Sequence, residues 1–365
     1  MRYRDPLKQI LTRTQSYWDV DETRPAIRRA FSLAQLCRTP ALGAEVYASE
    51  NEEKVVYHTC KSSACSSCGY RAMVQWLRER WAALPDTSYK GITFTMPDHL
   101  WQLFHDNRPL VRALSALAAT LIQTSVNVRY GLRVGVIAIL HTFNGRLEFN
   151  SHVHTMVTAG GLQASGHWVP SVYYDDKALM KAWRASVIKL LRRALRAGQL
   201  NTGMSIAELE AILARQEERT WIIKVQSLGS KEHFLRYAGR YVRRPPIAQR
   251  RITFIGEQSL TYWTDDKKLD CRVQVQCSLT QFIDRWAQHI LDLYQHAVRT
   301  FGLFAPRALS QTSPAVFALL GQKPRLRPKR LPWATSIQRD FGWDPLLGAN
   351  GNRMKRVRRV APAVV

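Results

Sequence analysis

The chain has 365 residues, of which 46% are hydrophobic, so it can bury at least one full core and favours two modules or one large domain with insertions. It carries 53 Lys and Arg against 28 Asp and Glu, a formal net charge of +25 that points to nucleic acid as the partner. The sequence has no run of eighteen apolar residues, so we expect no membrane span. Its first residues do not resemble a secretory signal, so we expect a cytoplasmic, nucleoid-associated protein.

Residues 1–90 contain few regular patterns. Before residue 70 little periodicity is visible, and apolar residues at helical spacing then predict a helix over 70–84. Residues 89–97 favour a β-strand that ends at Pro97, and residues 108–127 favour a long amphipathic helix.

Residues 132–161 contain two β-rich runs around an Asn-Gly turn signal, which predicts a β-hairpin. If the hairpin is symmetric about residues 146–147, His141 faces His152, although a one-residue slip would turn every side chain to the other face. His152 and His154 are two residues apart on one strand, so their imidazoles point to the same face. Imidazole binds many divalent metals, but most isolated His-x-His pairs are structural.

After the hairpin the pattern predicts two helices within 175–218, a strand over 220–228 and a helix over 229–246. A second hairpin over 251–266 and an amphipathic helix over 279–300 are expected to follow. Ser205 with Glu208 forms a capping box, and Ser230 is the expected N-cap of the helix that Pro245 and Pro246 end. Antiparallel hairpins combined with helices indicate an α+β fold.

Two tyrosines, Tyr237 and Tyr241, are four residues apart in the helix expected over 229–246, so both phenols lie on one helix face. Four arginines around them suit a phosphodiester backbone: Arg236, Arg240, Arg243 and Arg244. Spacing alone favours two aromatic residues packed on a core, but the arginines count against deep burial.

Three of the six cysteines, Cys60, Cys65 and Cys68, lie within nine residues, which favours a metal site over a disulfide framework. The Cys-x-x-Cys half is typical of a zinc site. The fourth ligand is expected to be Cys37 or His58, and the alternative is a degenerate site. The two remaining cysteines lie in strand-like sequence and are expected to be small buried hydrophobes: Cys271 and Cys277.

The sequence resembles the two-tyrosine HUH transposases of the insertion-sequence ninety-one type. Three motifs in the same order carry the resemblance: GITFTMP, then LHTF with FNSHVHTMVTAGGL, then FLRYAGRYVRRPPIA. The resemblance covers residues 28–307. It implies an antiparallel sheet with the metal ligands His152 and His154 on a central strand, and the paired nucleophiles Tyr237 and Tyr241 on a nearby helix.

The resemblance implies an enzyme that nicks and joins single-stranded DNA through 5′-phosphotyrosine intermediates, with Mg²⁺ or Mn²⁺, in rolling-circle transposition. A replication initiator or relaxase of the same chemistry, and a non-catalytic DNA-binding relative, are the alternatives. The covalent intermediate keeps the bond energy, and accordingly the sequence contains no phosphate-binding loop for ATP. We expect His141 as the third metal ligand, ahead of Glu148 and His233.

The cysteine cluster resembles the zinc-binding module that precedes the catalytic domain in this family, although YASE stands where relatives commonly have an earlier Cys-x-x-Cys. We expect residues 1–88 to form a small zinc-ribbon-like module that binds DNA and includes a linker helix. The HUH catalytic domain is expected over 89–305, with a helical insertion at 163–219, followed by a basic, flexible tail over 306–365.

The tail is strongly basic, because residues 301–365 contain 12 Lys and Arg against 2 Asp and Glu. A charge excess of this kind binds a DNA backbone without sequence preference. We therefore expect DNA contacts from Lys329, Arg330 and Arg356, in addition to the four arginines beside the tyrosines.

Overall fold

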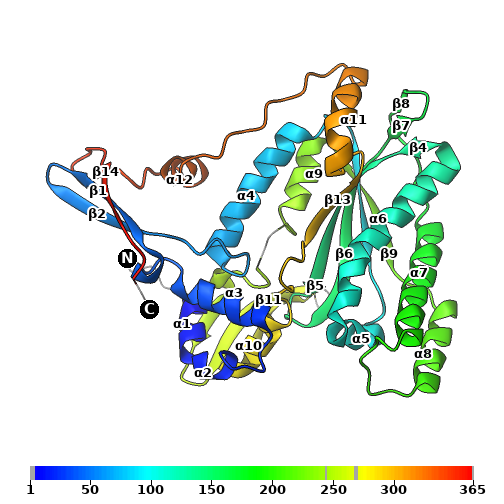
Figure 1. Ribbon diagram of the computed structural model, residues 1–365, viewed down its shortest axis with the longest axis horizontal. Helices are drawn as coiled ribbons and strands as arrows, with labels where there is room; N and C mark the ends of the chain where they lie inside the picture. The colour runs from blue at the N-terminus through cyan, green and yellow to red at the C-terminus, as the bar shows by residue number, and fades with distance from the viewer. Residues whose placement is uncertain (1–4, 243–244, 267–269, 364–365) are drawn as a thin grey trace.

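The computed structural model describes residues 5–242, 245–266 and 270–363, and it has the α+β architecture that the sequence predicts (Figure 1). Its central sheet has the strand order β13-β5-β6-β3-β9, and all neighbouring strands are antiparallel. The strands are β3 (Tyr89–Phe94), β5 (Gly135–Phe143), β6 (Phe149–Thr158), β9 (Ile223–Gly229) and β13 (Val298–Gly302).

Strands β5 and β6 form the predicted hairpin, and the predicted register is confirmed, because His141 pairs with His152. The turn is held by Asn144, whose Oδ1 accepts hydrogen bonds from the backbone N–H groups of Arg146 and Glu148. Alternate residues of each strand face opposite sides of the sheet, so Ile139 lies on the same face as all three histidines.

One face of the sheet is covered by helices α5 (Trp101–Asp106), α6 (Arg108–Tyr130), α7 (Asp176–Arg196) and α8 (Ile206–Glu218) (Figure 1). The buried residues of α6 recur every three or four positions: Val111, Leu114, Ser115, Ala118, Ala119, Ile122 and Val126. Among the described helices, α6 alone has the length and hydropathy of a candidate membrane span. In this structure its apolar face packs on the core of the sheet.

The other face of the sheet, which carries the histidines, is covered by α4 (Ser66–Ala83), α9 (Lys231–Ala238) and α11 (Pro306–Leu319). Sheet residues Ile137, Ile139 and Met156 pack there against Phe234 of α9 and Phe304. This packing fixes α9 over the strands that carry the histidines.

A second core joins the N-terminal helices to a sheet from much later in the chain. Its elements are α1 (Pro6–Arg13), α2 (Gln15–Trp18), α3 (Pro25–Leu36), β10 (Ile252–Ile255), β11 (Ser259–Asp266), β12 (Cys271–Ser278) and α10 (Leu279–Ala287). Trp18, Phe31 and Trp286 form its centre. Little periodicity was seen in the sequence before residue 70, yet α1 and α3 bury apolar residues at helical spacing against distant partners. Such short helices need this tertiary packing to be stable.

Residues 306–363 contain two helices and a strand instead of forming a flexible tail, so this part of the expectation is corrected. Val316 and Phe317 of α11 pack in the core beside the sheet, and α12 (Trp333–Phe341) follows. Strand β14 (Lys355–Val360) then pairs with β1 (Ala44–Ser49), which also pairs with β2 (Glu52–Tyr57). The first and last parts of the chain thus share a sheet, while the boundaries expected at residues 88 and 305 stay predictions.

Three other expectations differ from the structure. The helix expected over 279–300 ends at Ala287, because Val298–Gly302 instead forms β13 and pairs with the edge of β5. Cys271 is exposed on β12, whereas Cys277 is buried as expected. The expected insertion begins with short strands before its helices: β7 (Gly161–Gln163) and β8 (Trp168–Val169), which extend a small sheet with β4 (Leu132–Arg133).

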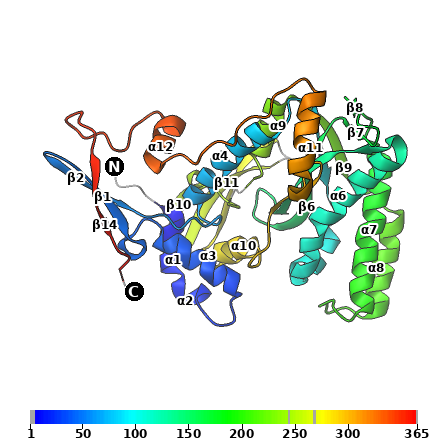
Figure 2. The same cartoon turned by 45° about the horizontal axis from the view of Figure 1, so that its top comes forward.

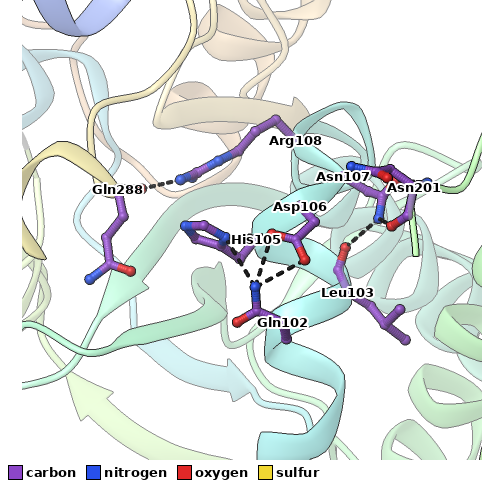
Figure 3. Close-up of polar contacts among 8 residues, drawn as sticks. All are labelled: Gln102, Leu103, His105, Asp106, Asn107, Arg108, Asn201 and Gln288. Carbon is purple, nitrogen blue, oxygen red and sulfur yellow. Dashed lines mark hydrogen bonds and ion pairs between the residues drawn. The ribbon is translucent and has the colours of Figure 1, made fainter. Parts of the chain in front are cut away.

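The junction between α5 and α6 ties three parts of the molecule together (Figure 3). Asn107 Nδ2 donates to the carbonyls of Leu103 and Asn201, each at 2.8 Å, and Asn107 Oδ1 accepts from Asn201 N at 2.7 Å. The next residue, Arg108, donates to the Gln288 carbonyl just after α10. The helical layer is thereby linked both to the α7–α8 connection and to the second core.

Replacing Asn107 by alanine should lower the free energy of unfolding by about 1–3 kcal/mol, because the buried Asn107 side chain makes three hydrogen bonds that alanine cannot make, two of them partly buried bonds to the Asn201 backbone. Urea unfolding would measure the change. Asn127→Ala, on the exposed side of α6, is the control and should stay within about 0.5 kcal/mol of the parent. Equal effects of the two substitutions would contradict the role of Asn107.

Candidate active site and zinc module

Three imidazoles gather on one face of the sheet, His141 from β5 and His152 and His154 from β6. One ring nitrogen of each lies within 4.8 Å of the others, close enough for a single ion between them. The other two candidates for a third ligand are elsewhere: Glu148 accepts from Asn144 at the hairpin tip, and His233 is exposed on α9.

Hydrogen bonds to the backbone define how two of these rings present their nitrogens. His141 Nε2 lies 2.9 Å from the carbonyl of Tyr241, and His152 Nδ1 lies 2.7 Å from the carbonyl of Asn150. A carbonyl only accepts, so these nitrogens carry the protons and donate, and the other nitrogen of each ring presents a lone pair. Burial, with the nearby His152, lowers the pKa of His141 to about 3, so this ring is neutral at pH 7.

The helix that carries the tyrosines is shorter than expected, because α9 ends at Ala238 instead of continuing to residue 246. Gly239, a weak helix former, follows, and Tyr241 lies in the next turn with its N–H bonded to the Ala238 carbonyl. The two rings still lie on the same side, with their centroids 4.9 Å apart.

Both tyrosines contact the histidines. The Tyr241 ring stacks on His154 with centroids 3.8 Å apart and an interplanar angle of 26°. The Tyr237 hydroxyl lies 3.3 Å from His154 Nδ1. The structure therefore brings together all five residues that the sequence singled out: His141, His152, His154, Tyr237 and Tyr241.

Thr93 is a site residue that sequence reasoning missed. It pairs with His154 across β3 and β6, and its Oγ1 lies 3.2 Å from His154 Nδ1. Burial raises the pKa of Tyr237, while a hydrogen bond from Thr93 acts in the opposite direction. The alternation in GITFTMP predicts which neighbours share a sheet face with Thr93. Only the pairing of β3 with β6 shows that the histidines lie on this face.

The described DNA-binding candidates are all exposed and come from different segments of the chain. Arg236 and Arg240 are exposed beside the tyrosines, and Arg243 and Arg244 lie outside the described residues. The other three belong to the C-terminal region: Lys329, Arg330 and Arg356. Arg356 lies on β14 and approaches Glu45 at 3.6 Å.

Four thiols gather where α3, the residues after β2 and the start of α4 meet: Cys37, Cys60, Cys65 and Cys68. Cys37 Sγ lies 3.8 Å from both Cys65 Sγ and Cys68 Sγ, and Cys60 Sγ lies 3.6 Å from Cys68 Sγ. A tetrahedral zinc ion with bonds of about 2.3 Å requires sulfurs about 3.8 Å apart, so the cluster fits zinc. His58 instead contacts the carbonyl of Leu42.

Comparison with known proteins finds two families, one that covers the thiol cluster and one that covers the histidines and tyrosines. Residues 9–96 match a family described as a transposase zinc-binding domain, and residues 135–312 match a family described as a putative transposase. The transposase for insertion sequence element IS801 of Pseudomonas savastanoi pv. phaseolicola is 31% identical over 333 residues, covering 86% of this chain and 80% of that protein. Putative transposase y4qJ of Sinorhizobium fredii is 28% identical, covering 81% and 79%.

Among solved structures, the N-terminal nuclease domain of minute virus of mice non-structural protein 1 matches 43% of this chain and 72% of its own. The two chains are 13% identical, with a TM-score of 0.21. The fold, the thiol cluster and the sequence matches define a transposase with an N-terminal zinc-binding domain. The chain belongs to the transposases of the insertion-sequence ninety-one type, which confirms the resemblance seen in its motifs.

The thiol geometry predicts about one zinc ion per chain in the purified protein. Cys68→Ser should remove most of this zinc and lower the thermal midpoint, because three thiols hold the ion poorly and the cluster borders the second core. Metal analysis and thermal unfolding would measure both effects. Cys271→Ser, at an exposed cysteine, should change neither, and full zinc content in the Cys68 variant would refute the site.

Proposed function

We propose that this transposase cuts and rejoins single-stranded DNA through 5′-phosphotyrosine intermediates, in rolling-circle-type transposition. The observation that supports it is the contact of Tyr237 and Tyr241 with three clustered imidazoles. Imidazole nitrogens gathered on one sheet face form a suitable donor set for a divalent cation. We assign His141, His152 and His154 to that cation.

The reaction needs a phenol to act as a nucleophile. The phenolic oxygen bonds to phosphorus while the bond from phosphorus to the 3′ oxygen breaks, and that oxygen takes up a proton to become a 3′-hydroxyl. Burial raises the pKa of Tyr237, so the phenolate is scarce at neutral pH. A bound Mg²⁺ or Mn²⁺ would polarise the scissile phosphate and offset the charge of the transition state.

His154 connects the cation site with the nucleophile. When Nε2 faces the cation, Nδ1 carries the proton and donates to Thr93 Oγ1 or to the Tyr237 hydroxyl oxygen. A donor at this place stabilises the developing phenolate. The hydrogen bond that Thr93 gives to Tyr237 acts in the same direction.

The second tyrosine has a role of its own. With the ring centroids of Tyr237 and Tyr241 4.9 Å apart, one phenol can hold a strand end while the other attacks a new phosphate. Exposed Arg236 and Arg240 lie on the same segment and suit the phosphates of the bound strand. Strand transfer between donor and target DNA requires these two activities in one site.

The zinc module would act in recognition. We assign the zinc ion to Cys37, Cys60, Cys65 and Cys68, whose mutual distances suit a closed structural site without an open coordination position. A closed site performs no chemistry, so the module is assigned to the binding of transposon-end DNA.

Changing both tyrosines, Tyr237→Phe with Tyr241→Phe, should abolish covalent capture of a single-stranded oligonucleotide in Mg²⁺ or Mn²⁺, because phenylalanine keeps the ring but has no oxygen to attack. Denaturing gels of the protein–DNA adduct, followed by mapping of the modified residue, would measure capture. Tyr294→Phe, at a tyrosine that is 87% exposed, is the control and should retain it. An adduct on the double variant would defeat the assignment.

Replacing Thr93 by valine should slow adduct formation by about 10-fold or more, because the isosteric side chain keeps the packing but loses the hydrogen bonds to His154 and Tyr237. Thr93→Ser keeps the hydroxyl and should restore most of the rate. Single-turnover kinetics at several pH values would measure this, and the valine variant should need a higher pH for half-maximal rate. A serine variant as slow as the valine variant would show a packing role only.

A further inference from the structure

The segment between α11 and α12, residues 320–332, runs alongside α4 in both views (Figure 1, Figure 2) and is called the strap below. One end of the strap is fixed to Asp86, which follows α4. Gln322 accepts from Asp86 N at 2.8 Å and donates to Asp86 O at 2.6 Å, and Arg325 forms an ion pair with the Asp86 carboxylate. The strap therefore has a defined position over α4.

An open groove of about 570 Å³ lies between the strap, α4 and α9. Its lining contains three arginines from three elements, together with apolar side chains, and no carboxylate among the described residues that line it. The lining residues are Leu77, Arg78, Trp81, Ala82, Leu235, Arg325, Leu326, Pro328 and Arg339.

The charges of the groove are only partly compensated. Arg325 is paired with Asp86, but no ion pair is found for Arg78 or Arg339 within the described part of the chain. Two guanidinium groups without carboxylate partners at the wall of a concave site favour an anionic ligand.

The groove also offers surfaces on which a base can stack. Trp81 is 39% exposed and Leu326 is 95% exposed, although both line the groove. The Trp81 ring is held in place by the Lys231 ammonium, 4.6 Å from its centroid. Arginines combined with exposed aromatic and apolar side chains are typical of sites that bind unpaired nucleotides, whose bases can leave the stack.

The groove adjoins the helix of the nucleophiles. Leu235 lines the groove and precedes Tyr237 by two residues, with the exposed Arg236 between them. Leu77 of α4 also packs against Gly239, directly before the turn that carries Tyr241. A DNA strand in the groove would therefore run beside the segment that holds both tyrosines.

We infer that this groove binds the single-stranded DNA that flanks the phosphate to be cut, with Arg78 and Arg339 on its phosphates and Trp81 on a base. The inference rests on the proposed function and adds a strand-binding site outside the catalytic residues. Duplex DNA is the less suitable occupant, because its bases are stacked on each other and unavailable to Trp81.

The test measures binding of a fluorescent single-stranded oligonucleotide and of the matching duplex over a series of salt concentrations. All proteins carry Tyr237→Phe and Tyr241→Phe, so that covalent capture does not contribute. Arg78→Ala with Arg339→Ala should weaken single-strand binding about 10-fold and reduce the salt slope by about 1.4, since each lost phosphate contact contributes about 0.7. Trp81→Leu should weaken single-strand binding at least about 5-fold with the slope unchanged.

The matched control is Arg193→Ala with Arg196→Ala, two exposed arginines on α7 that remove the same charge away from the groove. An equal loss of binding in this control would overturn the inference, because net charge alone would explain it. A loss of duplex binding as large as that of single-strand binding would also overturn it. Unchanged melting temperatures would exclude misfolding, and Trp81→Phe, which keeps a stacking surface, should retain most of the affinity.

The outcome is separable from that of the proposed function. If the parent transposase forms no adduct but single-strand binding depends on Arg78, Arg339 and Trp81, the phosphotyrosine mechanism is refuted and the assignment of the groove is supported. If adducts form while the groove variants bind normally, the chemistry stands and the groove is refuted.

Discussion

The antiparallel pairing of β5 with β6 in one register is the constraint on which the candidate site depends. It places His141 opposite His152 and turns both, with His154, toward the face that α9 covers. A shift by one residue would send the β6 imidazoles into the mainly apolar layer around Ile92 and Phe94, where their burial would cost free energy. Burial on both faces of the sheet therefore specifies the register, and the register specifies the site.

The parts of the fold that sequence reasoning predicted are those governed by local patterns. The Asn144-Gly145 turn and the alternation around it were enough to predict the hairpin and its pairing. The spacing of Tyr237 and Tyr241 predicted that their rings would lie together, and this holds although the helix ends between them. The backbone after Ala238 makes one further helix-like turn, so residues four apart still lie on the same side. The prediction for the two rings is therefore correct although the predicted end of the helix is wrong.

The parts that sequence reasoning missed are those decided by distant partners. Thr93 takes part in the site only through the pairing of β3 with β6, which no local pattern shows. Cys37 was one of two alternatives, and it joins the thiol cluster because α3 packs beside the start of α4. The N-terminal helices carry a helical period that sequence reasoning overlooked, with Leu7, Ile10 and Leu11 buried in α1. These short helices depend on a core shared with α10, more than two hundred residues later.

The pairing of β14 with β1 has a consequence for the newly made polypeptide. About 300 residues separate the end of β2 from β14, so at about 5–20 residues per second a ribosome needs tens of seconds between them. During this time the outer edge of β1 has no neighbour, and any prematurely terminated product keeps it bare. Only a polypeptide that has been translated past Val360 completes this sheet.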